Sequence, residues 1–433
     1  MRLFGSSGIR AVFNKDLLRT AFAVGMAVGK KYGDIAVARD TRTTGDAMKH
    51  AVISGLLASG ARCRDAGIVP TPTLAYLTRE FAAGIMITAS HNPPEYNGLK
   101  LFNPDGSSFG ARQQAPLERA IASEPPETAG WEDIKAVGSY DSAAARHIEC
   151  ILAHFKERLK IKVVVDAGGG AACGVTPLLL EKLGCEVIPL NCHPTGFFPR
   201  GIEPVEANLT ELCRLVKKNG AALGIAHDGD ADRLMAVDER GRYIPGDKLL
   251  VVLARAMEAK EVVTTLDASM AIDAMGFSVR RTRIGDTWVS GEMKKGGDFG
   301  GETSGAWIFP AISLCPDGIY AAALMAATAS QNRLSELADA IPAYPIKRGS
   351  ADSEGIDKSC LESGLKALKP VSVSNTDGLK LDFKDGWLLV RPSGTEPKIR
   401  LTAEAKTAAR AQQLYEKALR VIEDSRKTGG KTR

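Results

Sequence analysis

A serine, a histidine and an asparagine occur together directly after an apolar run of the chain. Residues 84–87 (Gly-Ile-Met-Ile) have the composition of a buried strand, and Ser90, His91 and Asn92 follow, before two prolines. Because proline cannot continue strand pairing, the prolines favour a rigid loop at this strand end. A nucleophile needs such a stiff support. The segment therefore predicts a nucleophilic Ser90, the alternative being a serine that caps a turn.

Three aspartates alternate after a second apolar run, residues 223–226. Asp228, Asp230 and Asp232 lie within five residues, and their charges repel one another unless a cation lies among them. Carboxylate oxygens are suitable ligands for Mg²⁺ or Ca²⁺. An EF-hand is excluded, because Arg233 stands where that loop requires glycine and the flanks resemble strands. The pattern predicts a divalent-metal site, the alternative being an acidic surface turn.

Two further polar loops have the residue types of a ligand site. Residues 391–400 provide backbone N–H groups around a glycine, two hydroxyls and two arginines, which are features of an oxyanion cradle. Its candidate phosphate-binding residues are Arg391, Ser393, Gly394, Thr395 and Arg400. In the glycine-rich run 300–305, Glu302 and Ser304 could bind sugar hydroxyls, since glycines let the backbone approach a ligand closely. A rigid turn and an ordinary loop are the alternatives.

A dinucleotide site is not expected in the glycine-rich run 166–170. Cys173 stands where the fingerprint requires a glycine or a substitute, and the next strand ends at Asn191 without the acid that binds ribose. A phosphate-binding loop of the Gly-x-x-x-x-Gly-Lys-Ser/Thr type is also missing from the sequence. ATP is therefore not the obvious phosphoryl donor.

A strand–helix–strand pattern that could position these loops occurs three times. Its first strands are expected at residues 35–40, 162–166 and 262–267, each ending in aspartate. Strands that alternate with helices predict α/β domains with parallel or mixed sheets. The remainder has short alternating segments and an amphipathic helix at 407–424, which predict a small α+β domain. The expected domains are 1–148, 149–243, 244–340 and 341–433.

The composition is that of an ordinary globular protein. The 433 residues are 44% hydrophobic and 25% charged, so large cores are possible. The formal charge of +5 does not indicate nucleic-acid binding, because four basic residues lie together in the last eight, without acids. The eight cysteines contain no Cys-x-x-Cys pair and are expected to be reduced thiols. Without a secretory or membrane-spanning run, we expect a cytoplasmic monomer or homodimer that binds neither nucleic acid nor membrane.

Taken in order, these motifs resemble the α-D-phosphohexomutases. The resemblance covers essentially the whole chain and includes residues 4–10 (Phe-Gly-Ser-Ser-Gly-Ile-Arg), 39–42 (Arg-Asp-Thr-Arg) and 69–72 (Val-Pro-Thr-Pro). It implies three related α/β domains with mixed sheets and a small C-terminal α+β domain, around a central cleft.

The resemblance also implies a mechanism. Ser90 would carry a phosphoryl group and, with the three aspartates, hold one Mg²⁺. The group would pass to a sugar monophosphate, giving a bound sugar 1,6-bisphosphate, which also serves as primer, turns around and returns its other phosphate to the serine. Arg10 and Arg233 would offset charge, Lys100 would be the acid/base group, and the loop 391–400 would hold the phosphate that does not react.

One position departs from the family pattern. Many members have histidine after the Gly-Glu-x-Ser-Gly of the sugar loop, whereas this chain has Ala306. The role of that histidine is therefore not transferred. The context 301–310 is more similar to prokaryotic members that act on glucosamine phosphate, with mannose or glucose phosphate as the alternative. A metal-dependent sugar phosphatase and an inactive sugar-phosphate-binding protein are the other classes that we consider.

Overall fold

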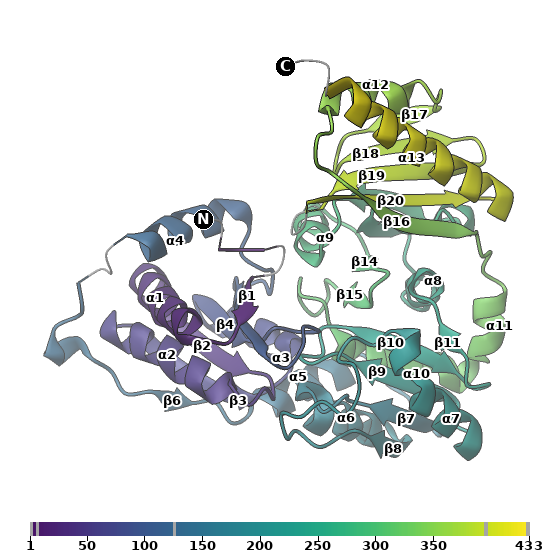
Figure 1. The fold of residues 1–433 in the computed structure, drawn as a ribbon. Helices are drawn as coiled ribbons and strands as arrows, with labels where there is room; N and C mark the ends of the chain where they lie inside the picture. Colours follow the sequence, from purple (N-terminus) through teal and green to yellow (C-terminus); the bar gives the residue numbers. More distant parts are fainter. Residues whose placement is uncertain (1–2, 6–7, 124–126, 394–396, 430–433) are drawn as a thin grey trace. The chain divides into compact units, whose positions relative to one another are not determined.

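The computed structural model describes residues 3–5, 8–123, 127–393 and 397–429 (Figure 1). The chain divides into two compact units. The first comprises Met1–Val262 with Gly285–Ala340, and the second comprises Val263–Ile284 with Ile341–Arg433. Each unit is described by itself below.

The first sheet of the first unit is mixed and has the strand order β1-β5-β4-β2-β3-β6. Its central strand β2 pairs in parallel with β3 and β4, whereas β5 is antiparallel to β4 and β1. The strands are β1 (Ile9–Val12), β2 (Asp34–Arg39), β3 (Arg62–Ile68), β4 (Ala83–Ile87), β5 (Tyr96–Phe102) and β6 (Gly138–Ser139).

Both faces of this sheet are covered, as the apolar run of β2 predicts. Ile35 and Val37 pack into a cluster with residues of α1, α2 and α4, while Ala36 and Ala38 pack into a second cluster with α3 and α5. This division follows from the strand period of two. The helices are α1 (Lys15–Tyr32), α2 (Gly45–Ala58), α3 (Thr71–Leu77), α4 (Ala111–Ala122) and α5 (Ala143–Leu152).

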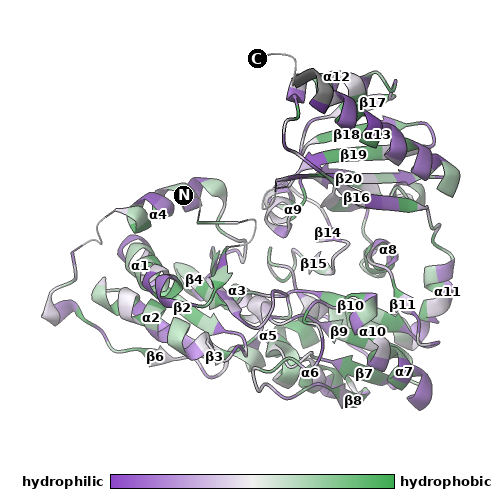
Figure 2. Ribbon diagram, in the orientation of Figure 1, coloured by the Kyte–Doolittle hydropathy of each residue, from purple (hydrophilic) through white to green (hydrophobic). Residues whose placement is uncertain are grey.

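The second sheet has the order β11-β10-β9-β7-β8, with β7 parallel to β8 and β9, and β10 antiparallel to β9. Every residue of β9 and β10 is buried, and Figure 2 shows these strands mostly in the hydrophobic colour. Strands covered on both faces need such continuous apolar runs. The elements are β7 (Lys162–Asp166), β8 (Glu186–Leu190), β9 (Leu223–His227), β10 (Leu234–Asp238), β11 (Tyr243–Ile244), α6 (Thr176–Leu183) and α7 (Thr210–Asn219).

The rest of the first unit contains an antiparallel pair, β14 and β15, and four helices. The helix α10 is the most deeply buried of them, and Asp317 caps its N-terminus by accepting the amides of Ile319 and Tyr320. The elements are β14 (Phe299–Glu302), β15 (Ala306–Ile308), α8 (Gly246–Ala256), α9 (Asp286–Met293), α10 (Gly318–Gln331) and α11 (Leu334–Asp339).

The second unit is built on an antiparallel sheet of order β16-β20-β19-β18-β17, against which α12 and α13 pack. Buried Glu404 ties the segment 263–284 to this sheet by accepting hydrogen bonds from the Ser269 hydroxyl, the Met270 amide and the Trp387 indole. The elements are β16 (Ile346–Asp352), β17 (Ser372–Ser374), β18 (Leu379–Phe383), β19 (Gly386–Pro392), β20 (Lys398–Ala405), α12 (Lys358–Lys366) and α13 (Ala408–Gly429), with β12 (Glu261–Thr265) and β13 (Ser278–Thr282) in the third α/β repeat.

The predicted fold class is confirmed, because strands and helices alternate in mixed sheets up to about residue 340 and an α+β arrangement follows. The domain boundaries stay predictions. Short 3₁₀ helices complete the described elements: η1 (Thr78–Glu80), η2 (Trp131–Asp133), η3 (Ala171–Gly174), η4 (Glu206–Asn208) and η5 (Ile272–Met275). Among the described residues, none of the helices combines the length and the apolar character needed to cross a membrane.

A buried lysine in the second unit predicts a pH-dependent stability. The Lys380 ammonium lies 4.9 Å from the centre of the Trp387 ring and 3.8 Å from Asp382 Oδ1. Burial, and then the charge of Arg281, lower the pKa of Lys380 from 10.5 to about 8. Between these values the unfolded chain binds a proton that the folded chain lacks. The contribution of Lys380 to the free energy of unfolding therefore rises with pH across this window.

We expect Lys380→Met to be more stable than the wild type at pH 7, by about 2 kcal/mol, and the gain to shrink as the pH rises toward 10. Thermal unfolding of both proteins at pH 7 and pH 10 measures the difference. Lys366→Met, which replaces an exposed lysine of α12, is the control for loss of a surface lysine. A gain of equal size at both pH values would contradict the prediction.

Candidate active site

Ser90 lies just beyond the C-terminal end of β4 and is almost completely buried. Its backbone has φ 51°, in the left-handed region that non-glycine residues rarely adopt. Its hydroxyl donates a hydrogen bond of 2.6 Å to Asp228 Oδ2 and lies 3.3 Å from Nδ1 of His91. The predicted nucleophile thus contacts the predicted metal loop, although 138 residues separate the two partners in sequence.

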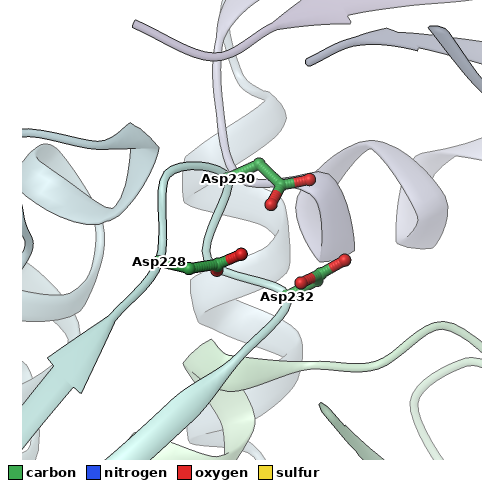
Figure 3. A group of neighbouring side chains, drawn as sticks. All are labelled: Asp228, Asp230 and Asp232. Carbon is green, nitrogen blue, oxygen red and sulfur yellow. The ribbon is translucent and has the colours of Figure 1, made fainter. Parts of the chain in front are cut away.

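The three aspartates lie on the tight turn that joins β9 to β10. Their carboxylates provide oxygen atoms that all lie within 4.8 Å of one another, and Figure 3 shows the side chains extending from this one turn. The turn needs glycine at position 229, because an added Cβ there would lie 2.6 Å from the carbonyl oxygen of Ser90. Glycine at position 229 therefore allows the turn with the aspartates to approach the Ser90 carbonyl closely.

Lys100, on β5, is the principal positive charge among these carboxylates. Its ammonium donates to Asp230 Oδ2 at 2.6 Å and to Asp232 Oδ2 at 2.5 Å. Thr71, at the start of α3, also donates to Asp230 Oδ2 at 2.5 Å. Burial opposes the charge of Lys100, but Asp230 and Asp232 raise its pKa. Burial also raises the pKa of Asp230, yet Lys100 and Thr71 outweigh it, so that this carboxyl remains ionised.

The donor set fits a divalent cation. The Oδ1 atoms of Asp230 and Asp232 are buried and have no hydrogen-bond partner among the residues that the structure describes. Burial, and then the charges of Asp232 and Asp230, raise the pKa of Asp228 well above its usual range. Buried carboxylate oxygens without a hydrogen-bond partner, close to other carboxylates, are what a hard cation satisfies. The three carboxylates could therefore hold Mg²⁺.

The candidate arginines lie near His91 of the serine loop, the segment 88–95 between β4 and β5. Arg10 on β1 donates to Asn92 Oδ1 at 3.1 Å, and Arg233 donates to Glu203 Oε1 at 3.0 Å. Burial, and then the charges of Arg233, Arg10 and Lys100, lower the pKa of His91 to about 3. His91 is therefore neutral at physiological pH, among three cations. Such a positive environment is suited to a phosphoryl group.

The candidate sugar loop is the turn between β14 and β15. Glu302 Oε1 accepts the Gly285 amide at 2.7 Å, and Ser304 is exposed. Ala306 is buried and forms a bridge with Arg233, which places this turn beside the metal loop. The structure thus brings the 302–306 turn close to the aspartates, as a shared site requires.

The candidate phosphate loop lies between β19 and β20 of the second unit. Arg391 and Arg400 are direct cross-strand partners, and Arg391 donates to Asp377 Oδ2 at 3.1 Å. Like charges in this position are unfavourable unless an anion lies nearby. The Ser393 amide donates to the Lys398 carbonyl at 2.7 Å. Gly394 and Thr395 lie outside the described residues.

The sequence interpretation missed Asp40, Arg42 and Thr88 as supports of the serine loop, although residues 39–42 carried part of the family resemblance. Arg42 donates to three carbonyls of the serine loop and to that of Tyr96, the first residue of β5, and it is fully buried. An aspartate at a strand end, as in the other two repeats, was the available signal. The glycine run 166–170 also has a structural role, because the amide of Ala171, directly after it, donates to the Gly229 carbonyl at 2.9 Å.

Comparison with known proteins gives a consistent result along the whole chain. Four family models match: phosphoglucomutase/phosphomannomutase alpha/beta/alpha domain I at residues 1–128, domain II at 142–241, domain III at 245–344, and the C-terminal domain at 352–421.

Relatives and a solved structure match over nearly the full length. A probable phosphoglucosamine mutase of Methanocella arvoryzae is 48% identical over 98% of both chains, and a phosphoglucosamine mutase of Methanocaldococcus jannaschii is 40% identical over 98% of this chain and 99% of its own. A crystal structure of a phosphoglucomutase/phosphomannomutase family protein from Burkholderia thailandensis has a TM-score of 0.85 at 27% identity, covering 98% of this chain and 97% of that one. The chain therefore belongs to the phosphoglucomutase/phosphomannomutase family of α-D-phosphohexomutases.

Proposed function

We propose that this chain is a phosphoglucosamine mutase, which interconverts glucosamine 6-phosphate and glucosamine 1-phosphate. The observation that carries the proposal is that full-length relatives at 40–48% identity bear this name. The contact of Ser90 with Asp228 supports the chemistry, because it joins a nucleophile to a cluster of carboxylates.

Each half-reaction transfers one phosphoryl group. The phosphorylated Ser90 gives its group to the free hydroxyl of the sugar monophosphate: the bond from Oγ to phosphorus breaks, and a bond from the sugar oxygen forms. The proton of that hydroxyl must leave, and the serine oxygen must gain one. Lys100, an ammonium that contacts Asp230 and Asp232, is the acid/base candidate: it would give a proton to Oγ and then take the proton of the sugar hydroxyl. After the sugar 1,6-bisphosphate turns around, the reverse transfer from its other end restores phosphoserine.

The charge on the transferred group is offset by residues of the first unit. Arg10 and Arg233 are the candidate arginines, and the charges of both lower the pKa of nearby His91. Mg²⁺, held by Asp228, Asp230, Asp232 and an oxygen of phosphoserine, would supply further positive charge. Positioning then accounts for much of the remaining rate enhancement.

The two ends of the sugar phosphate have separate candidate ligands. Glu302 and Ser304 would bind sugar hydroxyls, and Arg391, Ser393, Gly394, Thr395 and Arg400 would hold the phosphate that does not react. The arginine pair across β19 and β20 supports this anchor. Because either end of the sugar can present that phosphate, one anchor serves both half-reactions.

The test is Mg²⁺-dependent interconversion of the 1- and 6-phosphates of glucosamine, glucose and mannose, with a trace of sugar bisphosphate as primer. A preference for glucosamine phosphate supports the proposal, and a preference for glucose or mannose phosphate favours the phosphomannomutase/phosphoglucomutase alternative. Free phosphate released as fast as substrate disappears would indicate a sugar phosphatase. An unmodified Ser90 in protein from its native source, without turnover, would indicate an inactive sugar-phosphate-binding protein.

Replacement of the anchor arginine is expected to weaken substrate binding. We expect Arg391→Ala to raise KM by about 10-fold or more, with a smaller effect on kcat, because a guanidinium bond to the phosphate that does not react acts in both ground and transition states. Steady-state kinetics measures both constants. Arg410→Ala, which removes another arginine of the same unit, paired with Asp385, is the matched control. An unchanged KM would remove the anchor assignment.

A further inference from the structure

The residues of the Asp40–Arg42 pair lie at the end of β2, outside the candidate catalytic and binding set. Both side chains are completely buried, and Arg42 Nε donates to Asp40 Oδ2 at 3.2 Å. A buried ion pair is a weak source of stability, because desolvation offsets much of the attraction. Its role is therefore better sought in what the two side chains hold in place.

Arg42 uses all five of its side-chain N–H donors. One bonds to Asp40, and the other four bond to backbone carbonyls of the serine loop and of the first residue of β5 at 2.7–2.9 Å. These acceptors are the carbonyls of Ser90, Asn92, Pro93 and Tyr96. A planar guanidinium can serve four carbonyls at fixed angles, which an ammonium cannot do. Hydrogen bonds to this one side chain therefore hold the backbone around Ser90 in place.

The same pair also holds the other side of the Ser90 peptide. Asp40 Oδ2 accepts the Thr88 hydroxyl at 2.6 Å, and the oxygen of that hydroxyl accepts the Ser90 amide at 2.8 Å. The Ser90 carbonyl bonds directly to Arg42 at 2.8 Å. Both backbone polar groups of the nucleophile are therefore tied, directly or through one hydroxyl, to a single buried ion pair.

These hydrogen bonds matter because the Ser90 backbone has φ 51°. A non-glycine residue rarely adopts the left-handed region and persists there only where its surroundings enforce it. In the observed conformation the Ser90 hydroxyl reaches Asp228 Oδ2 at 2.6 Å. Relaxation of φ would turn the hydroxyl away from the metal loop.

We propose that the Asp40–Arg42 pair, with Thr88 as a relay, is a positioning device that enforces the left-handed conformation of Ser90 and aims its hydroxyl at Asp228. Its effect on turnover rests on the proposed function. Its effect on the Ser90 backbone does not. The pair therefore affects kcat by orienting the Ser90 hydroxyl. Arg42 and Thr88 need not contact the sugar phosphate.

The test compares Thr88→Val, which removes the relay hydroxyl, with Thr88→Ser, which keeps it. We expect Thr88→Val to lower kcat by about 100-fold, as misplacement of a reacting group does, with KM changed by less than about threefold. Thr88→Ser is expected to restore most of the activity. A purely structural role for Thr88 predicts instead an unchanged kcat per folded molecule, and that result would overturn the proposal.

Arg42→Lys tests the hydrogen bonds that the guanidinium makes to the Ser90 carbonyl and its neighbours. Arg242→Lys is the matched control, since Arg242 also pairs with a buried aspartate, Asp238, at 2.7 Å. We expect kcat to fall in the first variant and to be retained in the second, when both are assayed well below their melting temperatures. If Arg42→Lys does not fold, the Thr88 pair still decides the question.

A crystal structure of Thr88→Val supplies a readout that needs no activity. We expect Ser90 to leave positive φ and to lose its hydrogen bond to Asp228. A Ser90 that keeps both would overturn the proposal even if turnover had fallen. If the wild type itself converts no sugar phosphate, the proposed function fails, and this structural comparison still decides the positioning role.

Discussion

Ser90→Ala is expected to abolish mutase turnover, lowering kcat by at least about 1,000-fold, because removal of a nucleophile leaves the phosphoryl group without an acceptor. The fold should survive, since among the described residues the hydroxyl bonds only to Asp228 and His91. Kinetics with the bisphosphate primer, together with intact-mass analysis for one added phosphoryl group, measures the loss of turnover and of phosphoenzyme.

The matched control is Ser59→Ala, in which the lost hydroxyl donates to the Leu56 carbonyl at the end of α2. This variant is expected to keep full turnover and a phosphorylated Ser90. Substantial mutase activity in Ser90→Ala would rule out the phosphoserine mechanism. Phosphate found on another residue of the wild type would lead to the same conclusion.

Asp230→Asn is expected to have the second-largest effect. Asp230 Oδ2 accepts hydrogen bonds from Lys100 and Thr71, and its Oδ1 is buried without a partner in the described part of the chain. The neutral amide removes one negative charge from the cation site and leaves its NH₂ facing the Lys100 ammonium. We expect the Mg²⁺ concentration for half-maximal activity to rise about 10-fold or more, and kcat at saturating Mg²⁺ to fall about 100-fold.

Mg²⁺-dependent thermal stabilisation provides a readout without turnover, because a ligand that binds the folded state raises Tm. The wild type should gain stability with Mg²⁺, and Asp230→Asn should gain far less. Asp298→Asn, at an exposed aspartate that accepts the amides of Lys260 and Glu261, is the control. An equal Mg²⁺ response in Asp230→Asn and the wild type would exclude Asp230 as a ligand.

The fold class and the chemical character of the loops can be predicted from residue types and spacing alone. Apolar runs that end in polar residues mark β4 and β9 as buried strands, and the periodicity of two or 3.6 is a local property of the chain. For the same reason Ser90, Asp228, Asp230 and Asp232 could be singled out: their types and spacing are visible without knowing any long-range contact. The glycine at position 229 is also visible in the sequence, but the close contact with the Ser90 carbonyl that requires it is not.

How these loops meet depends on long-range packing, which residue types and spacing do not reveal. Lys100 was a weak sequence candidate, because a lone lysine is usually solvated, and its two bonds to aspartates 130 and 132 residues away arise from packing of β5 against the second sheet's loop. Arg42 carried no chemical signal of its own. Its importance comes from four backbone carbonyls, which have no sequence signature, and from a burial that depends on the complete fold. Contacts of this kind are set by three-dimensional packing, so that residue type and spacing predict the reacting groups but not the side chains that hold them in place.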